Sequence, residues 1–186
     1  MSPLRTATIL AIAAIAVAAA SSASALAANA SDQAPSTCPV TKPPDPAFRS
    51  PPPYHADAGN GMFWFGTEKL WIGLNTSGVW SLRHYTPEEP SFRQKMLWFR
   101  QGYKATAARP KLVVTGKRLD GPAPPLGVDG PHGAWLTEDP AQTFMTVGYN
   151  IPTTGCWEIT GEYGEDILSF VVWVRDGRLS HRQAPD

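Results

Sequence analysis

The segment IPTTGCWEITGEYGEDILSFVVWV, residues 151–174, decides the fold class. Residues 151–155 are predicted to form a turn, and the β-prone residues 156–161 a strand. Residues 163–166 turn the chain into a second apolar run, residues 167–174. Two such strands joined by a short turn are typical of a β-hairpin. The segment therefore predicts an all-β protein whose last element is a hairpin.

Short apolar runs alternate with turn residues before this hairpin. Predicted strands cover residues 62–65, 70–74, 79–82, 111–119 and 143–149. Residues 92–103 fit both a helical and a strand period, and the neighbouring strands and Gly102 favour one long strand. Residues 127–133 are predicted to form a loop, because glycine and proline interrupt them. Seven or eight short strands with frequent turns predict an immunoglobulin-like antiparallel β-sandwich.

The beginning of the chain has the pattern of a secretory signal peptide. Arg5 precedes an apolar run at residues 7–20, and small residues follow it. We expect residues 1–27 to be the signal peptide, with cleavage after Ala27 and an alternative cleavage after Ala30. The run is richer in Ala than in Leu and makes a poor permanent span, so we expect no membrane span after cleavage. The expected location is secreted or periplasmic.

The predicted mature chain divides into three parts. Residues 28–60 are punctuated by proline and are predicted to form an extended arm that docks on the domain. Residues 61–176 are predicted to form the sandwich, and residues 177–186 a polar tail. Cys38 and Cys156 are the two cysteines, and two cysteines in an oxidising compartment usually pair. A metal site is the alternative, but the neighbours of Cys156 include no further ligand.

Composition and motifs exclude several functions. The 16 basic and 16 acidic residues balance, which argues against nucleic-acid binding. The sequence has no His-Glu-x-x-His, Gly-x-Ser-x-Gly, phosphate-binding or dinucleotide motif, so no catalytic residue, metal or cofactor is predicted. The four histidines are expected to be solvated loop or tail residues: His55, His84, His132 and His181.

Five residues are candidates for ligand binding: Trp64, Trp71, Trp80, Trp135 and Glu158. Aromatic rings exposed on a sheet stack on sugar rings, whereas packing in the core is the alternative for each tryptophan. Glu158 shares a strand face with Cys156, which places it near the core or a sheet edge. It is either a functional carboxylate with a shifted pKa or an acid paired with an arginine such as Arg100 or Arg118.

Four segments carry a resemblance to a group of secreted bacterial proteins. They are the arm Cys-Pro-Val-Thr-Lys-Pro-Pro at residues 38–44, Phe-Trp-Phe-Gly at 63–66, Val-Thr-Gly-Lys-Arg-Leu-Asp-Gly at 114–121, and the strand around Cys156 with residues 168–174. The similarity extends over most of the predicted mature chain. It implies export and an immunoglobulin-like domain, and it implies no particular reaction.

Two functions follow as expectations. The first is an exported, non-catalytic β-sandwich module with a structural, adhesive or ligand-binding role in the cell envelope or the medium. Its ligand is unknown, with carbohydrate and protein as the candidate classes. The alternative is a small secreted hydrolase, acting on saccharide or peptide, that uses Glu158 with Asp120 or Glu162.

Overall fold

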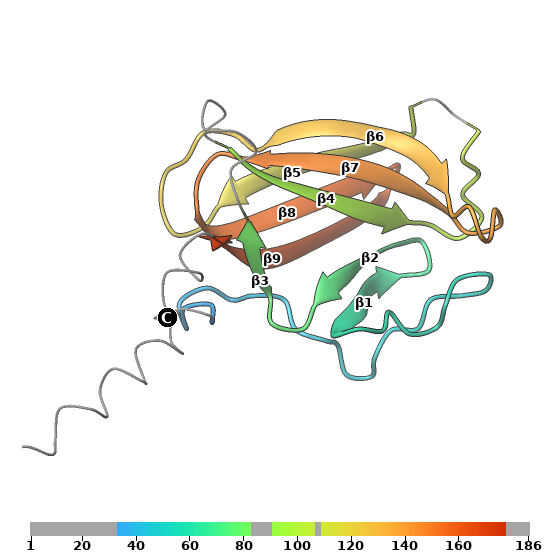
Figure 1. Ribbon diagram of the computed structural model, residues 1–186, viewed down its shortest axis with the longest axis horizontal. Helices are drawn as coiled ribbons and strands as arrows, with labels where there is room; N and C mark the ends of the chain where they lie inside the picture. Colours follow the sequence, from blue (N-terminus) through green and yellow to red (C-terminus); the bar gives the residue numbers. More distant parts are fainter. Residues whose placement is uncertain (1–32, 83–90, 107–108, 178–186) are drawn as a thin grey trace, which may run out of the picture. The chain divides into compact units, whose positions relative to one another are not determined.

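The structure is a computed structural model that describes residues 33–82, 91–106 and 109–177. In this part of the chain, nine strands form two sheets packed against each other (Figure 1). The strands are β1 (Met62–Thr67), β2 (Leu70–Asn75), β3 (Val79–Leu82), β4 (Phe92–Phe99), β5 (Leu112–Arg118), β6 (Gly127–Trp135), β7 (Thr143–Ile151), β8 (Gly155–Tyr163) and β9 (Asp166–Asp176). Among these described residues there is no helix long and apolar enough to cross a membrane. The predicted signal peptide, residues 28–32 of the predicted arm and residues 178–186 of the predicted tail lie outside the described residues.

The order of the strands is that of an immunoglobulin-like sandwich. One sheet has the order β1-β2-β4-β7-β6 and the other β3-β9-β8-β5. The four neighbours β2-β4-β7-β6 correspond to strands A, B, E and D of the immunoglobulin fold, and β5, β8 and β9 correspond to C, F and G. The chain changes sheet between β2 and β3, and β3 pairs with β9 in parallel. The predicted fold class, an all-β sandwich, is confirmed.

The core lies between the sheets and is rich in aromatic residues. Trp98 of β4, Trp157 of β8 and Phe170 of β9 are all buried there. The Nε1 of Trp98 donates a hydrogen bond of 2.7 Å to the hydroxyl oxygen of Tyr149 in β7. On β8, Gly161 leaves room for the Trp98 ring, which occupies the place where a Cβ of residue 161 would lie. A glycine of one sheet therefore makes room for a large ring of the other.

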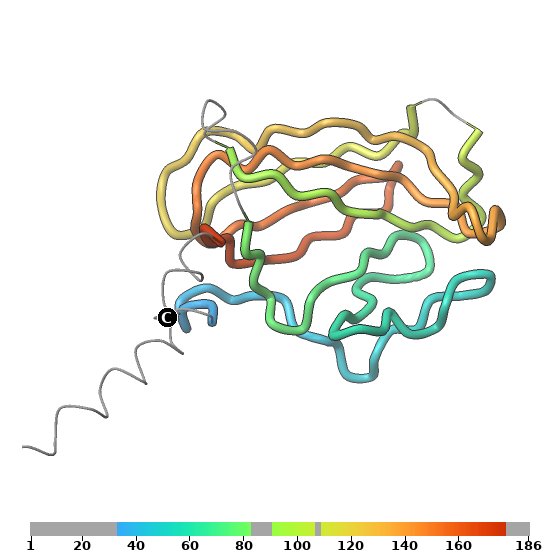
Figure 2. Tube along the Cα trace, in the orientation of Figure 1, coloured from blue at the N-terminus to red at the C-terminus, as the bar shows by residue number. Residues whose placement is uncertain are grey.

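The arm contacts both sheets. Cys38 forms a disulfide with Cys156 of β8, as predicted, and Thr41 exchanges two hydrogen bonds of 2.9 and 2.8 Å with Val171 of β9. Further along, the hydroxyl of Tyr54 donates to the carbonyl of Thr143 in β7 at 2.7 Å, on the other sheet. Figure 2 shows the arm, in blue, running along the side of the sandwich that carries β1 to β3. The arm thus passes from one sheet to the other.

Two predictions about individual strands are wrong. Residues 127–133 form most of strand β6 and not a loop, because β6 pairs with β7 around an irregularity between Asp129 and His132. Gly130, with φ of 104°, and Pro131 occupy this irregularity, and β6 is an edge strand whose outer side needs no N–H donor. The long strand predicted for residues 92–103 ends at Phe99, because a turn follows in which Gly102 has φ of 69°.

Candidate functional site

A second apolar cluster lies outside the sandwich core. It consists of Tyr54 from the arm, Trp71 of β2, Phe99 of β4 and Phe144 of β7, all of them buried. Trp71 and Phe99 are cross-strand partners, and their rings stack with centroids 5.8 Å apart. Tyr54 meets the Trp71 ring edge-on at 5.1 Å. The arm therefore covers part of the outer face of the five-stranded sheet, where an uncovered sandwich would meet water.

A pocket of about 340 Å³ opens beside this cluster. We call it the aromatic pocket, and seven of its lining residues are apolar: Tyr54, Ala58, Trp64, Leu97, Phe99, Leu136 and Phe144. Its polar groups come from His55, Asp57 and Gln142. This volume lies within the range of small-molecule sites, which are mostly apolar with a few polar groups.

The wall of this pocket contributed by the arm is held by hydrogen bonds. The carbonyl of His55 accepts from the Nε1 of Trp64 at 2.9 Å and from the hydroxyl of Ser50 at 2.6 Å. Asp57 forms an ion pair with Arg49 at 3.2 Å, and both side chains are exposed. The backbone of His55 is thus fixed at the pocket, while its side chain is exposed.

A second and larger hollow of about 910 Å³ lies on the same sheet face. We call it the polar groove, and its lining includes Lys95 of β4, Asp129 and His132 of β6, and Thr146, Gly148 and Asn150 of β7. Arg93 and Gln94 of β4 also line it. His132 Nε2 lies 3.7 Å from Asp129 Oδ1, and both of these side chains are exposed.

The strand register shows that pocket and groove adjoin. Lys95, Gly148 and Asp129 lie in one cross-strand row, and Leu97, Thr146 and His132 form the next row. In the row after that, Phe144 lies opposite Ala134, and the ring of Phe99 is 5.9 Å from that of Phe144. The outer face therefore changes from polar to aromatic along β4, β7 and β6. We call the aromatic pocket and the polar groove together the trough.

The four predicted tryptophans do not share one surface. Trp64 is half-buried in the aromatic pocket. Trp71 is fully buried beneath the arm, and Trp80 is buried in the core, stacked on Tyr149 at 6.0 Å. Trp135 is 58% exposed and lines a separate hollow of about 490 Å³. Trp71 and Trp80 are therefore both buried, one beneath the arm and one in the core, and neither presents a ring face to a ligand.

Glu158 lies on the outer face of the other sheet and pairs with Lys117. Its carboxylate is 2.9 Å from Lys117 Nζ, because the two residues are direct cross-strand partners in β8 and β5. The arginines named as alternatives bind other acids, since Arg118 Nε contacts Asp120 at 2.6 Å and Arg100 contacts Asp166. The prediction that Glu158 pairs with a basic side chain is therefore right, but its partner is Lys117 and not an arginine.

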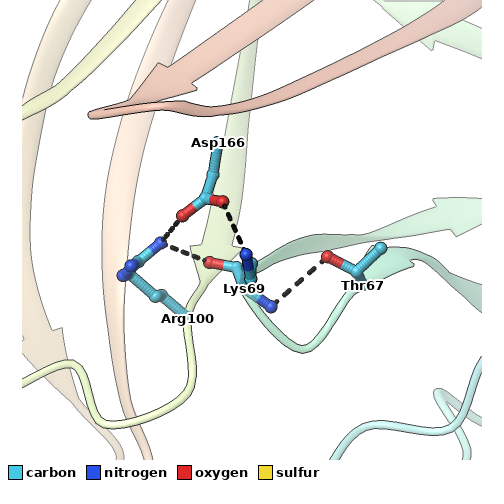
Figure 3. Close-up of polar contacts among 4 residues, drawn as sticks. All are labelled: Thr67, Lys69, Arg100 and Asp166. Carbon is cyan, nitrogen blue, oxygen red and sulfur yellow. Dashed lines mark hydrogen bonds and ion pairs between the residues drawn. The ribbon is translucent and has the colours of Figure 1, made fainter.

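Figure 3 shows what Arg100 does at the end of the sandwich. Its guanidinium binds Asp166 in β9 and donates to the carbonyl of Lys69 at 2.8 Å. The guanidinium carbon also lies 4.7 Å from the centre of the Tyr163 ring. These contacts join the turn between β1 and β2 to the β8–β9 hairpin. The cluster links the two sheets and is structural.

The hydrolase alternative names Glu158 with Asp120 or Glu162, and the pair Glu158 and Glu162 is too widely spaced for glycoside hydrolysis. Glu158 and Glu162 are four residues apart on β8, a separation of about 13 Å, whereas such pairs lie about 5 to 10 Å apart. Burial alone would raise the pKa of Asp120, but hydrogen bonds from Arg118 and from the backbone of Cys156 outweigh burial and lower it. An acid with a lowered pKa is ionised at neutral pH and is a poor proton donor.

Sequence reasoning missed most residues of the trough. A signal was present: Met96, Leu97, Trp98 and Phe99 form a continuous apolar run, which is typical of a strand covered on both faces. The same segment also fits a helical period through Phe92, Met96 and Phe99. The polar residues of the groove gave no such signal, because alternating polar residues are expected on any solvent-facing strand.

The described residues contain no group of three or more His, Cys, Asp or Glu side chains placed to hold a metal ion. The trough is a site with polar and aromatic walls. Comparison with known proteins identifies no relative, since no family model, no curated protein and no solved structure matches the chain.

Proposed function

We propose that this chain is an exported, non-catalytic β-sandwich module that binds a ligand in the trough, in the cell envelope or the medium. The observation that carries the proposal is the trough itself. It combines an aromatic pocket of about 340 Å³ with a polar groove of about 910 Å³ on one sheet face. Concave surfaces with apolar walls and a few convergent polar groups are the usual form of ligand sites.

Export is supported by two features. The Cys38–Cys156 disulfide is compatible with an oxidising compartment. The sequence of residues 1–27 has the charged, apolar and small-residue regions of a signal peptide in the expected order. The resemblance to secreted bacterial proteins agrees with both.

Binding is favoured over catalysis by the state of the carboxylates. Asp166, Glu158 and Asp120 each form an ion pair with a basic side chain. A hydrolase needs an acid and a base or nucleophile converging on one substrate bond. In the described part of the chain these three acids serve as partners of Arg100, Lys117 and Arg118 instead.

The test is a ligand screen by thermal unfolding. The full chain, expressed with its export signal and purified from the medium or periplasm, is heated with panels of oligosaccharides, peptides, fatty acids and nucleosides. A ligand at about 100 times its dissociation constant stabilises the folded state by about 2.7 kcal/mol, which is several degrees in Tm. We expect at least one panel to give this increase.

The site is tested with Gly148→Val, which fills the floor of the polar groove. A Cβ at residue 148 meets Asp129 Cβ at 3.4 Å, an ordinary contact, and valine suits a strand. Lys111→Ala, an exposed residue just before β5 of the other sheet, is the control. The proposal is supported if Gly148→Val loses the ligand-induced Tm increase while Lys111→Ala keeps it. A screen with no increase, or an increase that Gly148→Val retains, contradicts it.

A further inference from the structure

We infer that the ligand of the trough is an uncharged oligosaccharide, lying along β4, β7 and β6 with one sugar ring in the aromatic pocket. This inference rests on the proposed binding function. It specifies the chemical class of the ligand, which follows from the shape, the polar groups and the charge balance of the trough.

The length of the trough favours an extended ligand. Asn150 and Phe144 lie on the outer face of β7 six residue steps apart, which is about 20 Å at about 3.3 Å per step. Gly148 lies between them and contributes no side chain to the floor. A chain of several sugar rings fits this length, whereas a single small metabolite would occupy only the aromatic pocket.

The polar groups match hydroxyl groups. Asn150 and Thr146 each donate and accept hydrogen bonds, Lys95 only donates, and the Asp129 carboxylate only accepts. Each sugar hydroxyl is both a donor and an acceptor, so such a mixed set can satisfy a row of them. Lys95 has no ion-pair partner among the described residues, and its ammonium group is therefore available to a ligand oxygen.

The charges of the trough favour a neutral ligand. Arg93 and Lys95 are basic and Asp129 and Asp57 are acidic, and Asp57 is itself paired with Arg49. A site for an acidic or basic polymer would carry one predominant sign. The trough instead mixes basic and acidic side chains, so neither sign of charge predominates along its walls.

The aromatic pocket supplies the apolar contact that a sugar ring needs. The C–H bonds of a sugar are electropositive and pack against the electron-rich faces of aromatic rings. Trp64 is half-buried at this pocket, with Phe99 at 5.2 Å from its ring centre behind it. Its indole is held in place by the hydrogen bond to the carbonyl of His55.

A peptide fits the trough less well. Peptides that bind to sheets usually add a strand at an edge, where the main chain finds hydrogen-bond partners. The trough lies on a sheet face, and the adjacent edge strand β6 is interrupted at Pro131, which has no N–H. A fatty acyl chain would find the aromatic pocket but would leave the polar groove unfilled.

The experiment is a glycan array probed with the full exported chain, with affinities of any positives measured by calorimetry. The array carries neutral β-linked and α-linked glucose, N-acetylglucosamine, xylose and mannose oligomers, together with acidic oligosaccharides. We expect binding to neutral oligomers that strengthens with length over the first few units. Lys95→Ala is expected to weaken binding about tenfold, the effect of losing one good hydrogen bond from a charged group.

Controls separate this inference from the proposed function. Lys111→Ala removes an equally exposed lysine from the other sheet and is expected to leave the affinity unchanged. Neutral glycan binding that Gly148→Val abolishes and Lys95→Ala weakens supports the inference. Absence of binding to every neutral oligomer overturns it, and so does binding that both variants retain. If the thermal screen instead finds a peptide, fatty-acid or acidic ligand that Gly148→Val excludes, the binding function stands and the saccharide inference fails.

Discussion

At the scale of single residues, the pair Trp98–Tyr149 is the most sensitive point of the core. The indole N–H of Trp98 is buried, and the hydroxyl oxygen of Tyr149 is its acceptor at 2.7 Å. A buried donor that loses its acceptor keeps its desolvation cost without compensation. We therefore predict that Tyr149→Phe lowers the free energy of unfolding by about 1 to 3 kcal/mol at neutral pH, as measured by urea denaturation.

Tyr149 also makes the stability of the folded protein depend on pH. Burial raises the pKa of Tyr149 well above its usual value of 10.0, against the opposing effect of the Trp98 hydrogen bond. The unfolded chain releases this proton near pH 10 while the folded chain keeps it. The folded state then binds more protons, so the protein loses stability as the pH rises above 10. Tyr149→Phe lacks this loss, and the difference between the two proteins is expected to narrow in that range.

Tyr163→Phe is the matched control for this substitution. The Tyr163 ring lies beneath Arg100, and no hydrogen bond of its hydroxyl is found among the described residues. Its removal is expected to change the free energy of unfolding by less than about 0.5 kcal/mol. Equal changes in the free energy of unfolding for the two substitutions would contradict a stabilising role of the Trp98–Tyr149 hydrogen bond.

At the scale of elements, β8 depends on a residue without a side chain. Gly161 faces the core, and the Trp98 ring occupies the space of its missing Cβ. Gly161→Ala is expected to lower the free energy of unfolding by about 1 to 3 kcal/mol, the usual effect of overpacking a filled core. Gly148→Ala makes the same change on the outer face, where the nearest atom is 3.4 Å away, and is expected to be close to neutral. Similar Tm values for both variants would contradict this account of the core.

Several elements were predictable from sequence because their signals are local. The β8–β9 hairpin combines β-prone runs with a Gly164 turn, and the disulfide follows from two cysteines in a chain with an export signal. Strand β6 was missed because its glycines and Pro131 are usually loop residues, and only pairing with β7 makes them a strand. The partner of Glu158 was missed for a related reason: the register of β5 against β8 selects Lys117, and register is a long-range property.

The trough was harder to predict than the strands. Its polar side chains come from three strands, and its aromatic pocket also needs Tyr54 of the arm. No local pattern links Tyr54 with β7. The Tyr54 hydroxyl donates to the carbonyl of Thr143, 89 residues away, and the Tyr54 ring shares a cluster with Phe144. Burial of Trp71 has the same origin, since the arm covers a strand face that would otherwise be exposed.

At the scale of the whole molecule, one covalent bond fixes how the arm meets the sandwich. The Cys38–Cys156 disulfide joins residues 118 apart, and a crosslink of that span stabilises the folded state by up to about 4 to 5 kcal/mol through the unfolded chain. We predict that Cys38→Ser combined with Cys156→Ser lowers the free energy of unfolding by up to this amount. Limited proteolysis is expected to cut the arm between residues 42 and 58 faster than in the parent chain.

Reduction of the unmodified protein by a phosphine under native conditions is the companion measurement. It is expected to reproduce the faster cleavage of the arm, because both treatments leave it held only by noncovalent contacts such as those of Thr41, Tyr54 and His55. An arm that resists protease equally in the oxidised and disulfide-free forms would show that its noncovalent contacts are sufficient.

The disulfide also determines where the molecule bears mechanical load. When the two chain ends are pulled apart, tension enters at Cys38, crosses the sulfur–sulfur bond to Cys156 and continues through β8 and β9. The chain enclosed between the two cysteines, which includes the arm beyond Cys38 and strands β1 to β7, lies outside this path. The aromatic pocket and the polar groove belong almost wholly to that enclosed part. A tethered module of this kind can be stretched from its ends while the walls of its trough carry none of the force directly.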